Sequence, residues 1–360
     1  MSGATIRIGD RLVGGANPTY FIADIAANHD GDLGRACDLI HLAAQAGADG
    51  AKFQNFRAAT IVSDLGFRRL GGQQSHQAAW KKSVFEVYAD ASIPFDWTPT
   101  LAETCTAAGV DYLTAPYDMA AVDELTPYMP AIKIGSGDVT WIEMIHHIAS
   151  QGKPVLLATG ASDIGDVQRA MDALREHSAD IVLMQCNTNS TGSIENLRHV
   201  NLRVLETYRT MFPNVVLGLS DHTPGHATVL GAVAFGARAV EKHFTDDTTR
   251  TGPDHGFSMD PHAWREMVDR TRELEAALGS PEKRVAENER QTVVLQRRCV
   301  RAARPIRAGE VIEREMLAVL RPSPVGAIQP YEIERVVGAR AAVDLAEGEE
   351  LTWLSVSGPA

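Results

Sequence analysis

The sequence predicts an α/β fold in which a (β/α)8 barrel is followed by a small β-rich module. Three observations indicate this fold. Eight short β-rich runs recur along the first 280 residues, with amphipathic helical patterns between them. The length of 360 residues suits one large barrel and a small appendage. A short motif then occurs twice near the end of the chain.

The eight expected strands follow one another along the barrel part of the chain. In chain order they are YFIADIA (20–26), GAKFQNF (50–56), DYLTAP (111–116), AIKIGS (131–136), PVLLATG (154–160), DIVLMQCN (180–187), VVLGLSD (215–221) and AVEKHF (239–244). Helical patterns between them include residues 33–48, 166–178 and 224–237. An open doubly wound sheet is the alternative. It usually carries a glycine-rich dinucleotide turn after the first strand, and AANHDGDLG lacks that fingerprint.

The character of the sequence changes after the barrel, which we place at residues 1–280. Residues 281–296 are polar and charged and are typical of a linker or an exposed helix. Residues 297–360 form the β-rich module, in which ARPIRAGEVI (303–312) and AVDLAEGEEL (342–351) share one frame. We expect internal pseudo-symmetry there, and two unrelated turns are the alternative.

Composition excludes several classes of function. The formal net charge of −12 argues against nucleic acid or an anionic membrane as the main partner. Four cysteines without a CxxC pair are typical of reduced thiols, so we expect a cytoplasmic protein. No signal-peptide core is present, and the longest apolar run (227–237) is too short to cross a bilayer.

Lysines inside two apolar strands indicate a charged site. Lys52 lies in GAKF and Lys133 in AIKIGS, where a barrel lysine must face an anion or a carboxylate. Ser136 and its glycine turn can cradle a phosphate. These residues favour an anionic substrate, and a Schiff-base lysine is the competing interpretation. The strand ends add Gln54, Thr159 and Asn187 as candidate substrate-binding residues, because of their position alone.

Two histidines end adjacent strands. His222 and His243 can therefore reach one divalent ion whose remaining positions are open to water and substrate. Asp221 and Asp254 lie nearby in sequence, and His29 and His255 are possible further ligands. Hydrogen-bonding histidines in a polar barrel mouth are the alternative.

A metal beside an anion site predicts a reaction in which the metal polarises a carbonyl and a phosphorylated partner attacks it. A barrel amidohydrolase is the rival. That chemistry expects an H-x-H pair on the first strand, and ADIAANH does not supply one.

The sequence resembles the sialic acid (N-acetylneuraminate) synthase family, with its legionaminate, pseudaminate and spore-coat relatives. The motifs are IADIAANHDGDLGRACDLI, AGADGAKFQ, KIGSGD, GLSDHTPG, EKHFTDD and GPDH. The tail, RRCVRAARPIRAGEVI with LRPSP, resembles the antifreeze-like (SAF) domain of that family. The resemblance runs from about Tyr20 to Trp353.

The resemblance implies condensation of phosphoenolpyruvate with the aldehyde of an N-acylated hexosamine, giving a sialic-acid-like product and phosphate. It implies His222 and His243 as ligands of a divalent metal, most often Mn²⁺, with Mg²⁺ or Co²⁺ possible. Around phosphoenolpyruvate it implies Lys52, Lys133, Ser136 and Ser220. Near the sugar the resemblance implies Asp24, Asp138 and Asp254 as the catalytic carboxylates. It also implies a domain-swapped homodimer in which Arg321 of one chain reaches the sugar bound to the other.

Departures from the family pattern concern the acceptor side. Asp24 and Asp138 stand where the family usually has Glu, and Ala158 stands where it has Ser. Strand six offers Gln185 and Ser190 in place of His and Tyr. A long loop, 71–97, carries His76, Lys81 and Lys82. The acceptor is therefore an N-acetylmannosamine-like sugar or a different aldose. A non-catalytic sugar-binding barrel is the non-enzyme alternative.

Overall fold

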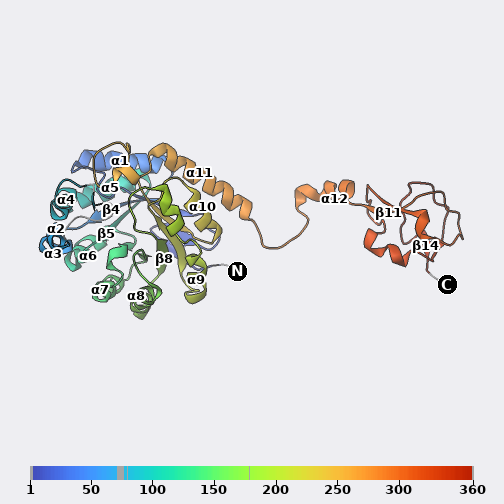
Figure 1. Cartoon of the computed structure of the whole chain (residues 1–360), viewed down its shortest axis with the longest axis horizontal. Helices are drawn as coiled ribbons and strands as arrows, with labels where there is room; N and C mark the ends of the chain where they lie inside the picture. The colour runs from blue at the N-terminus through green and yellow to red at the C-terminus, as the bar shows by residue number, and fades with distance from the viewer. Residues whose placement is uncertain (1–2, 71–76, 79, 178, 359–360) are drawn as a thin grey trace. The chain divides into compact units, whose positions relative to one another are not determined.

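The computed structural model describes residues 3–70, 77–78, 80–177 and 179–358. Within them the chain divides into two compact units, Met1–Gly279 and Ser280–Ala360 (Figure 1). His76 belongs to the long loop, residues 71–97, that departs from the family pattern, and it lies outside the described residues.

The first unit is built around eight parallel strands, which confirms the predicted barrel. They are β3 (Tyr20–Asp24), β4 (Gly50–Asn55), β5 (Asp111–Pro116), β6 (Ile132–Ile134), β7 (Val155–Ala158), β8 (Ile181–Cys186), β9 (Val216–Asp221) and β10 (Ala239–His243). Their order is β5-β4-β3-β10-β9-β8-β7-β6, and β5 and β6 lie side by side at the nearly closed seam.

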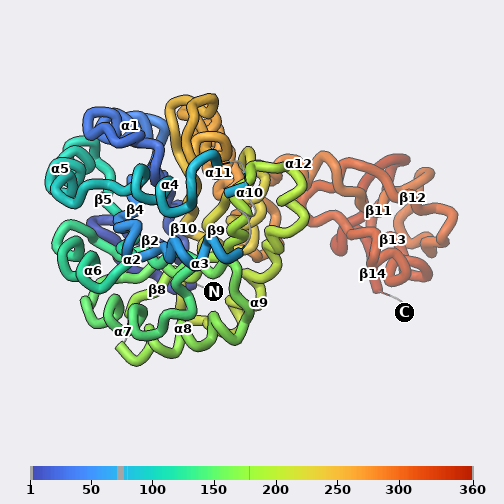
Figure 2. Tube along the Cα trace, turned by 60° about the vertical axis from the view of Figure 1, so that its left-hand side comes forward, coloured from blue at the N-terminus to red at the C-terminus, as the bar shows by residue number. Residues whose placement is uncertain are grey.

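Helices cover the outside of this barrel (Figure 2). They are α1 (Leu33–Gln45), α5 (Thr98–Ala108), α6 (Met119–Leu125), α7 (Ile142–Ser150), α8 (Ile164–Glu176), α9 (Val204–Met211), α10 (Ala227–Ala234) and α11 (Pro261–Leu278). Three short helices, α2 (Ala58–Ile61), α3 (Asp64–Arg69) and α4 (Val84–Ala91), follow β4. Caps fix several starts: Asp163 and Asp166 form a reciprocal capping box at α8.

An N-terminal hairpin, β1 (Thr5–Ile8) and β2 (Arg11–Gly14), precedes the barrel. Its buried side chains Ile6, Ile8 and Val13 belong to the same apolar cluster as Tyr20 and Ile22 of β3. The hairpin therefore closes the amino-terminal end of the barrel interior with apolar surface.

The period-two alternation of the strands separates two cores. In β3, Phe21 and Ala23 pack toward the helices, while Tyr20 and Ile22 belong to the interior cluster. Asp24 lies two residues after Ile22, so its side chain also points to the interior. The same alternation along β10 puts Glu241 and His243 on the face of Ala239, with Lys242 on the opposite face.

The second unit is a small β-rich fold with its own apolar core. Its strands are β11 (Cys299–Ala302), β12 (Leu317–Leu320), β13 (Arg340–Ala341) and β14 (Val356–Ser357), and a short helix, α12 (Arg290–Gln296), precedes them. The exposed residues 281–289 come before that helix and contain one 3-10 turn, Glu287–Glu289.

The two copies of the repeated motif in this unit bond to each other. Ile306 and Leu345, which occupy equivalent positions, exchange backbone hydrogen bonds of 2.9 and 2.8 Å. The amide of Gly309 donates to the carbonyl of Ala341, and the equivalent Gly348 donates to Ala302. Both glycines have positive φ, of 84° and 80°. The repeat is therefore a structural pseudo-two-fold, as its sequence predicts.

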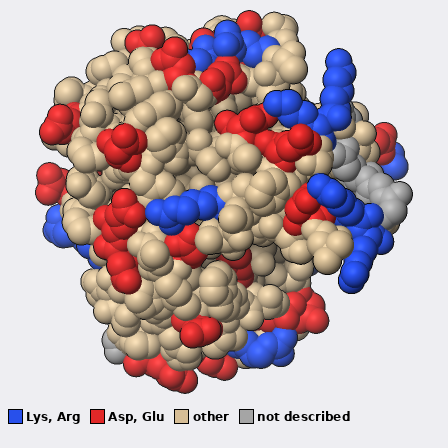
Figure 3. Space-filling model, turned by 90° about the vertical axis from the view of Figure 1, so that its left-hand side faces the viewer, with Lys and Arg blue, Asp and Glu red and all other residues tan. Residues whose placement is uncertain are grey.

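Charge is dispersed over one face of the molecule. On the face shown in Figure 3, acidic and basic side chains are interspersed among uncharged ones. Across the described part of the chain, no helix has both the length and the apolar character needed to cross a membrane.

Candidate active site

Strand register brings the predicted polar residues to one level at the carboxyl end of the barrel. His243 pairs with Asp24, and Asp24 pairs with Lys52 on the next strand. Ser220 pairs with Glu241. All of these residues stand at strand positions whose side chains point to the barrel interior, so their side chains meet inside the barrel mouth.

Asp24 is the centre of the first contact network. Its buried Oδ2 accepts hydrogen bonds from Lys52 Nζ at 2.7 Å and Gln54 Nε2 at 2.9 Å. His243 Nε2 lies 3.5 Å from the same oxygen. The other oxygen, Oδ1, is buried and has no hydrogen-bond partner among the described residues.

Glu241 links the two lysines. Its Oε1 lies 3.5 Å from Lys133 Nζ and 3.8 Å from Lys52 Nζ, and it accepts a hydrogen bond from Ser220 Oγ at 3.2 Å. Burial alone would lower the pKa of Lys52, but Asp24 and Glu241 outweigh it and raise that pKa. Lys52 is therefore a fixed ammonium ion, which suits anion binding and opposes the Schiff-base alternative, since imine formation needs a neutral amine.

The two histidines face each other, with ring centroids 5.2 Å apart. His222 Nδ1 lies 3.0 Å from the carbonyl oxygen of Asn187, so this nitrogen carries a proton and Nε2 is the nitrogen left to face a ligand. Burial lowers the pKa of His222, but contacts with Cys186, Asp221 and the Asn187 carbonyl outweigh burial and raise that pKa. Burial holds the pKa of His243 well below its ordinary value, which keeps that ring neutral. Its Nδ1 is buried without a partner within the described ranges.

These features fit a divalent metal bound by His222 and His243, and binding of the ion would displace the proton that the raised pKa of His222 favours. In the part of the chain that the structure describes, no group of three or more His, Cys, Asp or Glu side chains is arranged to hold an ion. A site here would therefore need water and substrate to complete its coordination, as a catalytic site does.

Other predicted neighbours of the histidines have structural partners. Asp221 lies on the outer face, where its Oδ2 accepts from Lys242 Nζ at 2.6 Å and from Thr228 Oγ1 at 2.6 Å. His255 uses both ring nitrogens, on Thr245 at 2.8 Å and on Asp30 at 2.9 Å. His29 Nδ1 accepts from the amide of Gly31 at 3.0 Å.

Two half-buried carboxyls at the mouth have raised pKa values. Burial raises the pKa of Asp138 to about 6, against the opposing effect of Lys133. Burial likewise raises the pKa of Asp254 to about 6, and Asp254 Oδ2 accepts from the amide of Ala27 at 3.2 Å. Such groups gain and lose protons near neutral pH, as a general acid or base must.

The remaining candidates divide between the mouth and structural positions. Ser136 Oγ accepts from the amide of Gly160 at 2.9 Å, and a Cβ at Gly160 would come within 2.4 Å of Thr188. Glycine is therefore required for this close approach. Thr159 Oγ1 donates to the Met184 carbonyl and contacts Tyr208, both at 2.9 Å, so its hydroxyl is already engaged.

Asn187 and Arg321 also have backbone partners. Asn187 Nδ2 donates to the His199 carbonyl at 3.3 Å, and its own carbonyl orients His222. Arg321 lies in the second unit, where its Nε donates to the Gln296 carbonyl at 2.6 Å.

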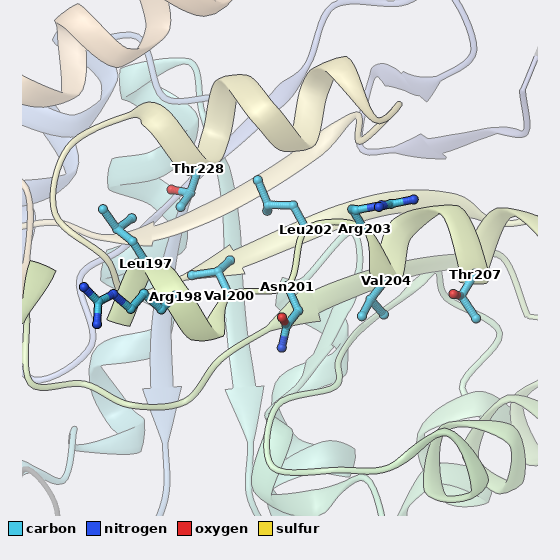
Figure 4. Close-up of a pocket in the computed structure, with 9 residues that line it drawn as sticks. All are labelled: Leu197, Arg198, Val200, Asn201, Leu202, Arg203, Val204, Thr207 and Thr228. Carbon is cyan, nitrogen blue, oxygen red and sulfur yellow. The ribbon is translucent and has the colours of Figure 1, made fainter. Parts of the chain in front are cut away.

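Above this network lies a cavity of about 970 Å³. The loops after β3, β8 and β10, together with α4, supply its walls, which include Ala27, Ser190, Arg250 and Phe257. A second hollow, of about 590 Å³, lies on the flank of the barrel between residues 197–207 and Thr228 (Figure 4). The residues that line it contain none of the predicted site residues.

Sequence reasoning assigned no role to two residues of this site. Glu241 bridges both lysines. It lies two residues before His243 in the same strand, so both side chains point to the same face, and this spacing could have indicated its place in the site. Phe257 packs against both histidine rings, with centroids 4.7 Å from His243 and 5.9 Å from His222. It follows the last strand by several residues, and no spacing rule indicated it.

A parallel barrel that gathers lysines, carboxylates and two histidines at the carboxyl ends of its strands defines a (β/α)8 enzyme. The NeuB family matches residues 39–283 and the SAF domain matches residues 297–356. The chain belongs to the NeuB family, with a SAF domain as its second unit, and is an enzyme of the N-acetylneuraminate synthase class.

Relatives cover almost the whole chain. The N,N'-diacetyllegionaminic acid synthase of Legionella pneumophila is 32% identical over 94% of this chain and 95% of its own. The human N-acetylneuraminate-9-phosphate synthase is 30% identical over 95% and 93%. Among solved structures, the N-acetylneuraminic acid (sialic acid) synthetase of Leptospira borgpetersenii has a TM-score of 0.71 at 25% identity, over 81% of this chain and 96% of its own.

Proposed function

We propose that the chain condenses phosphoenolpyruvate with the open-chain aldehyde of an N-acylated hexosamine, giving a nonulosonic acid and inorganic phosphate. The observation that carries this proposal is one linked network of buried lysines, carboxylates and histidines. Three of its polar atoms, Asp24 Oδ1, Glu241 Oε2 and His243 Nδ1, are buried without a hydrogen-bond partner in the described parts of the chain. Unpartnered buried polar atoms are rare, and their concentration here indicates a place for ligand.

Phosphoenolpyruvate binds at the lysine side of the network. Lys52 and Lys133 supply positive charge, Ser136 and Ser220 supply hydroxyls, and Glu241 keeps the two ammonium groups in place. The low dielectric of the barrel interior strengthens these contacts once the anion displaces water.

The reaction forms one carbon–carbon bond and breaks one carbon–oxygen bond. C3 of the enol attacks the aldehyde carbon, and the aldehyde oxygen takes a proton. Water then adds its oxygen to C2 and releases a proton, and the bond between C2 and the phosphate oxygen breaks to expel phosphate. Asp138 and Asp254 are suited to exchange these protons because their pKa values lie near 6. Asp24, through its unpartnered oxygen, can accept a sugar hydroxyl.

His222 and His243 would hold a divalent ion, Mn²⁺ in the first place, with Mg²⁺ or Co²⁺ as alternatives. When bound, such an ion polarises the aldehyde oxygen and so activates the acceptor. The chain's own contribution is to orient the His222 ring through the Asn187 carbonyl and to keep the buried His243 ring neutral.

The acceptor and the assembly are further parts of the proposal. The relatives are named for N,N'-diacetyllegionaminic acid and for N-acetylneuraminate 9-phosphate, which supports an amino-sugar acceptor. An N-acetylmannosamine-like sugar and a different aldose are both compatible with the shorter carboxylates Asp24 and Asp138. The resemblance to the family further supports a homodimer in which Arg321 of each chain contacts the sugar bound to the other chain.

Phosphate release tests the proposal. Purified protein is incubated with phosphoenolpyruvate, Mn²⁺ and a panel of aldoses, and products are identified by mass spectrometry. We expect stoichiometric phosphate and a product whose mass equals aldose plus pyruvate. Borohydride added during turnover should trap no adduct at Lys52 or Lys133. Sugar binding without phosphate release from any aldose would instead establish a non-catalytic sugar-binding barrel.

A further inference from the structure

Phe257 lies between the histidine pair and the mouth cavity. It ends a 3-10 turn, His255–Phe257, that follows Asp254. Its ring meets the ring of His243 edge-on at 68° with centroids 4.7 Å apart, and its centroid lies 5.9 Å from that of His222. The same residue lines the cavity of about 970 Å³. One aromatic side chain thus touches both proposed metal ligands and the space through which an aldehyde must arrive.

The backbone around Phe257 is held from two sides. A Cβ at Gly192 would lie 3.2 Å from Phe257 Cβ, so the loop after β8 approaches closely. Asn196 holds that loop, since its Nδ2 donates to the Asn189 carbonyl and to Thr191 Oγ1, both at 3.1 Å. On its other side the turn is fixed by Ser258 Oγ, which donates to the Asp254 carbonyl at 2.7 Å.

Most charged side chains around the cavity form ion pairs with one another. Arg250 donates to Asp30 Oδ2 from Nε at 2.9 Å and from a terminal nitrogen at 2.6 Å. Lys82 donates to Asp90. Lys81 is an exposed third cation. A ligand with a phosphate group would have to compete with Asp30 and Asp90, whereas an uncharged ligand would leave these pairs intact.

Apolar surface supplies much of the remaining wall. It comes from Ala27, Val87, Ala91 and Pro253 together with Phe257. An aromatic face binds the C–H and methyl groups of a sugar while its hydroxyls bond elsewhere. The methyl of an N-acyl group or of a 6-deoxy sugar is the part of an aldose that fits such a wall.

We propose that Phe257 is a specificity-determining residue, which selects an uncharged aldose carrying acyl or deoxy methyl groups over a phosphorylated or fully hydroxylated one. This inference rests on the proposed condensation. It names the residue that distinguishes one acceptor from another and the chemical class of acceptor that this residue favours.

Steady-state kinetics with Phe257→Ala and Phe257→Leu test the inference. The acceptors are an N-acylated hexose, the same sugar with a second acylamino group, its 6-deoxy form and its 6-phosphate. We expect Phe257→Ala to reduce the preference for methyl-bearing acceptors by about tenfold, mainly through KM. Phe257→Leu, which keeps an apolar side chain, should retain most of the preference. Phe235→Ala, the same change at the residue that directly follows α10, is the matched control.

Two measurements separate selection from a general loss of the site. Mn²⁺ affinity, measured by electron paramagnetic resonance, should be equal in wild type and Phe257→Ala. Calorimetric affinity for each aldose should follow the kinetic preference. An unchanged preference in Phe257→Ala, an equal loss for every acceptor accompanying weaker Mn²⁺ binding, or a wild type that prefers the 6-phosphate would each overturn the inference. If wild type turns over no aldose, the proposed function fails, and calorimetric affinities alone then decide the role of Phe257.

Discussion

The histidine pair is the feature of the site that permits the sharpest test at the scale of single residues. His222→Ala or His243→Ala should each reduce turnover on the order of a thousandfold, because each removes a ligand of the ion that polarises the aldehyde. Chelation with EDTA should inactivate the wild type and Mn²⁺ should restore it. Phosphate release and thermal melting are measured together, with His146→Ala, a half-buried histidine of α7 outside the site, as the control. Full activity after exhaustive chelation, with no metal found by elemental analysis, would contradict the two-histidine site.

Asp138 predicts a pH dependence whose sign follows from its burial. Its pKa is raised from 3.8 to about 6, so between these values the folded chain keeps a proton that the unfolded chain has released. The free energy of unfolding therefore falls as pH rises from about 4 to 6, and the loss persists above that range. Because Asp138 is half-buried, we expect a loss of about 1–2 kcal/mol.

Asp138→Asn should remove this loss. Urea unfolding of both proteins between pH 4 and 7.5 gives the difference curve, which should rise in favour of the variant as pH increases. Two curves that stay parallel over the whole range would show that burial does not raise the pKa of this carboxyl.

At the scale of elements, the buried pair of Lys242 and Asp221 ties β10 to the turn that leads into α10. Lys242→Met would leave Asp221 buried and charged without its cation, and should cost about 3–5 kcal/mol of unfolding free energy. Adding Asp221→Asn should recover part of that cost, because the amide can still bond to Thr223 and Thr228. Chemical denaturation measures both. Equal stability of the single variant and the wild type would mean that the pair contributes little to the barrel.

Alternation within strands explains how much of the fold and the site the sequence could predict. All eight barrel strands are short apolar runs with turns at their ends, and their polar carboxyl ends indicated Asp24, Lys52, Lys133, Ser220 and His243. The N-terminal hairpin was missed, although TIRI and RLVG flank a Gly-Asp turn with Gly9 at φ 54°. A four-residue strand that only becomes stable by closing a barrel gives a weak local signal.

The partners of side chains depend on three-dimensional register and were harder to foresee. Asp221 is the last residue of β9, directly before His222, yet it lies an odd number of positions from the interior residue Ser220, and its side chain turns outward to Lys242. His255 was a possible ligand by composition, but both of its nitrogens hold the loop together. Phe257 depends on how two loops from different strands approach each other, which no local pattern encodes.

At the scale of the whole molecule, the proposed homodimer predicts complementation between two inactive variants. His222→Ala and Arg321→Ala are each expected to be nearly inactive. Unfolded and refolded together, they should regain activity, because one site in each mixed dimer combines an intact His222 with the partner's intact arginine. The planar guanidinium suits this role because it can clamp a carbonyl or a pair of hydroxyls.

The refolded mixture has a clear contrary outcome. If each tail served its own barrel, every site would lack one group and the mixture would stay inactive. Each variant refolded alone is the control for recovery of the fold. Light scattering at the working concentration provides an independent measurement, and a monomer there would exclude a site shared between chains.

The reciprocal bonding of the two motifs in the second unit has a consequence for how this unit could have originated. Gly309 donates to Ala341 and Gly348 donates to Ala302, in each case the residue directly before the opposite copy, and Ile306 and Leu345 bond to each other. Each of these hydrogen bonds therefore joins one copy to the other or to its first flanking residue. A peptide with one copy would leave these donors and acceptors unpaired unless two such peptides associated. An ancestor with a single motif could therefore have been stable only as a pair of separate chains, and gene duplication would have joined that pair into one polypeptide.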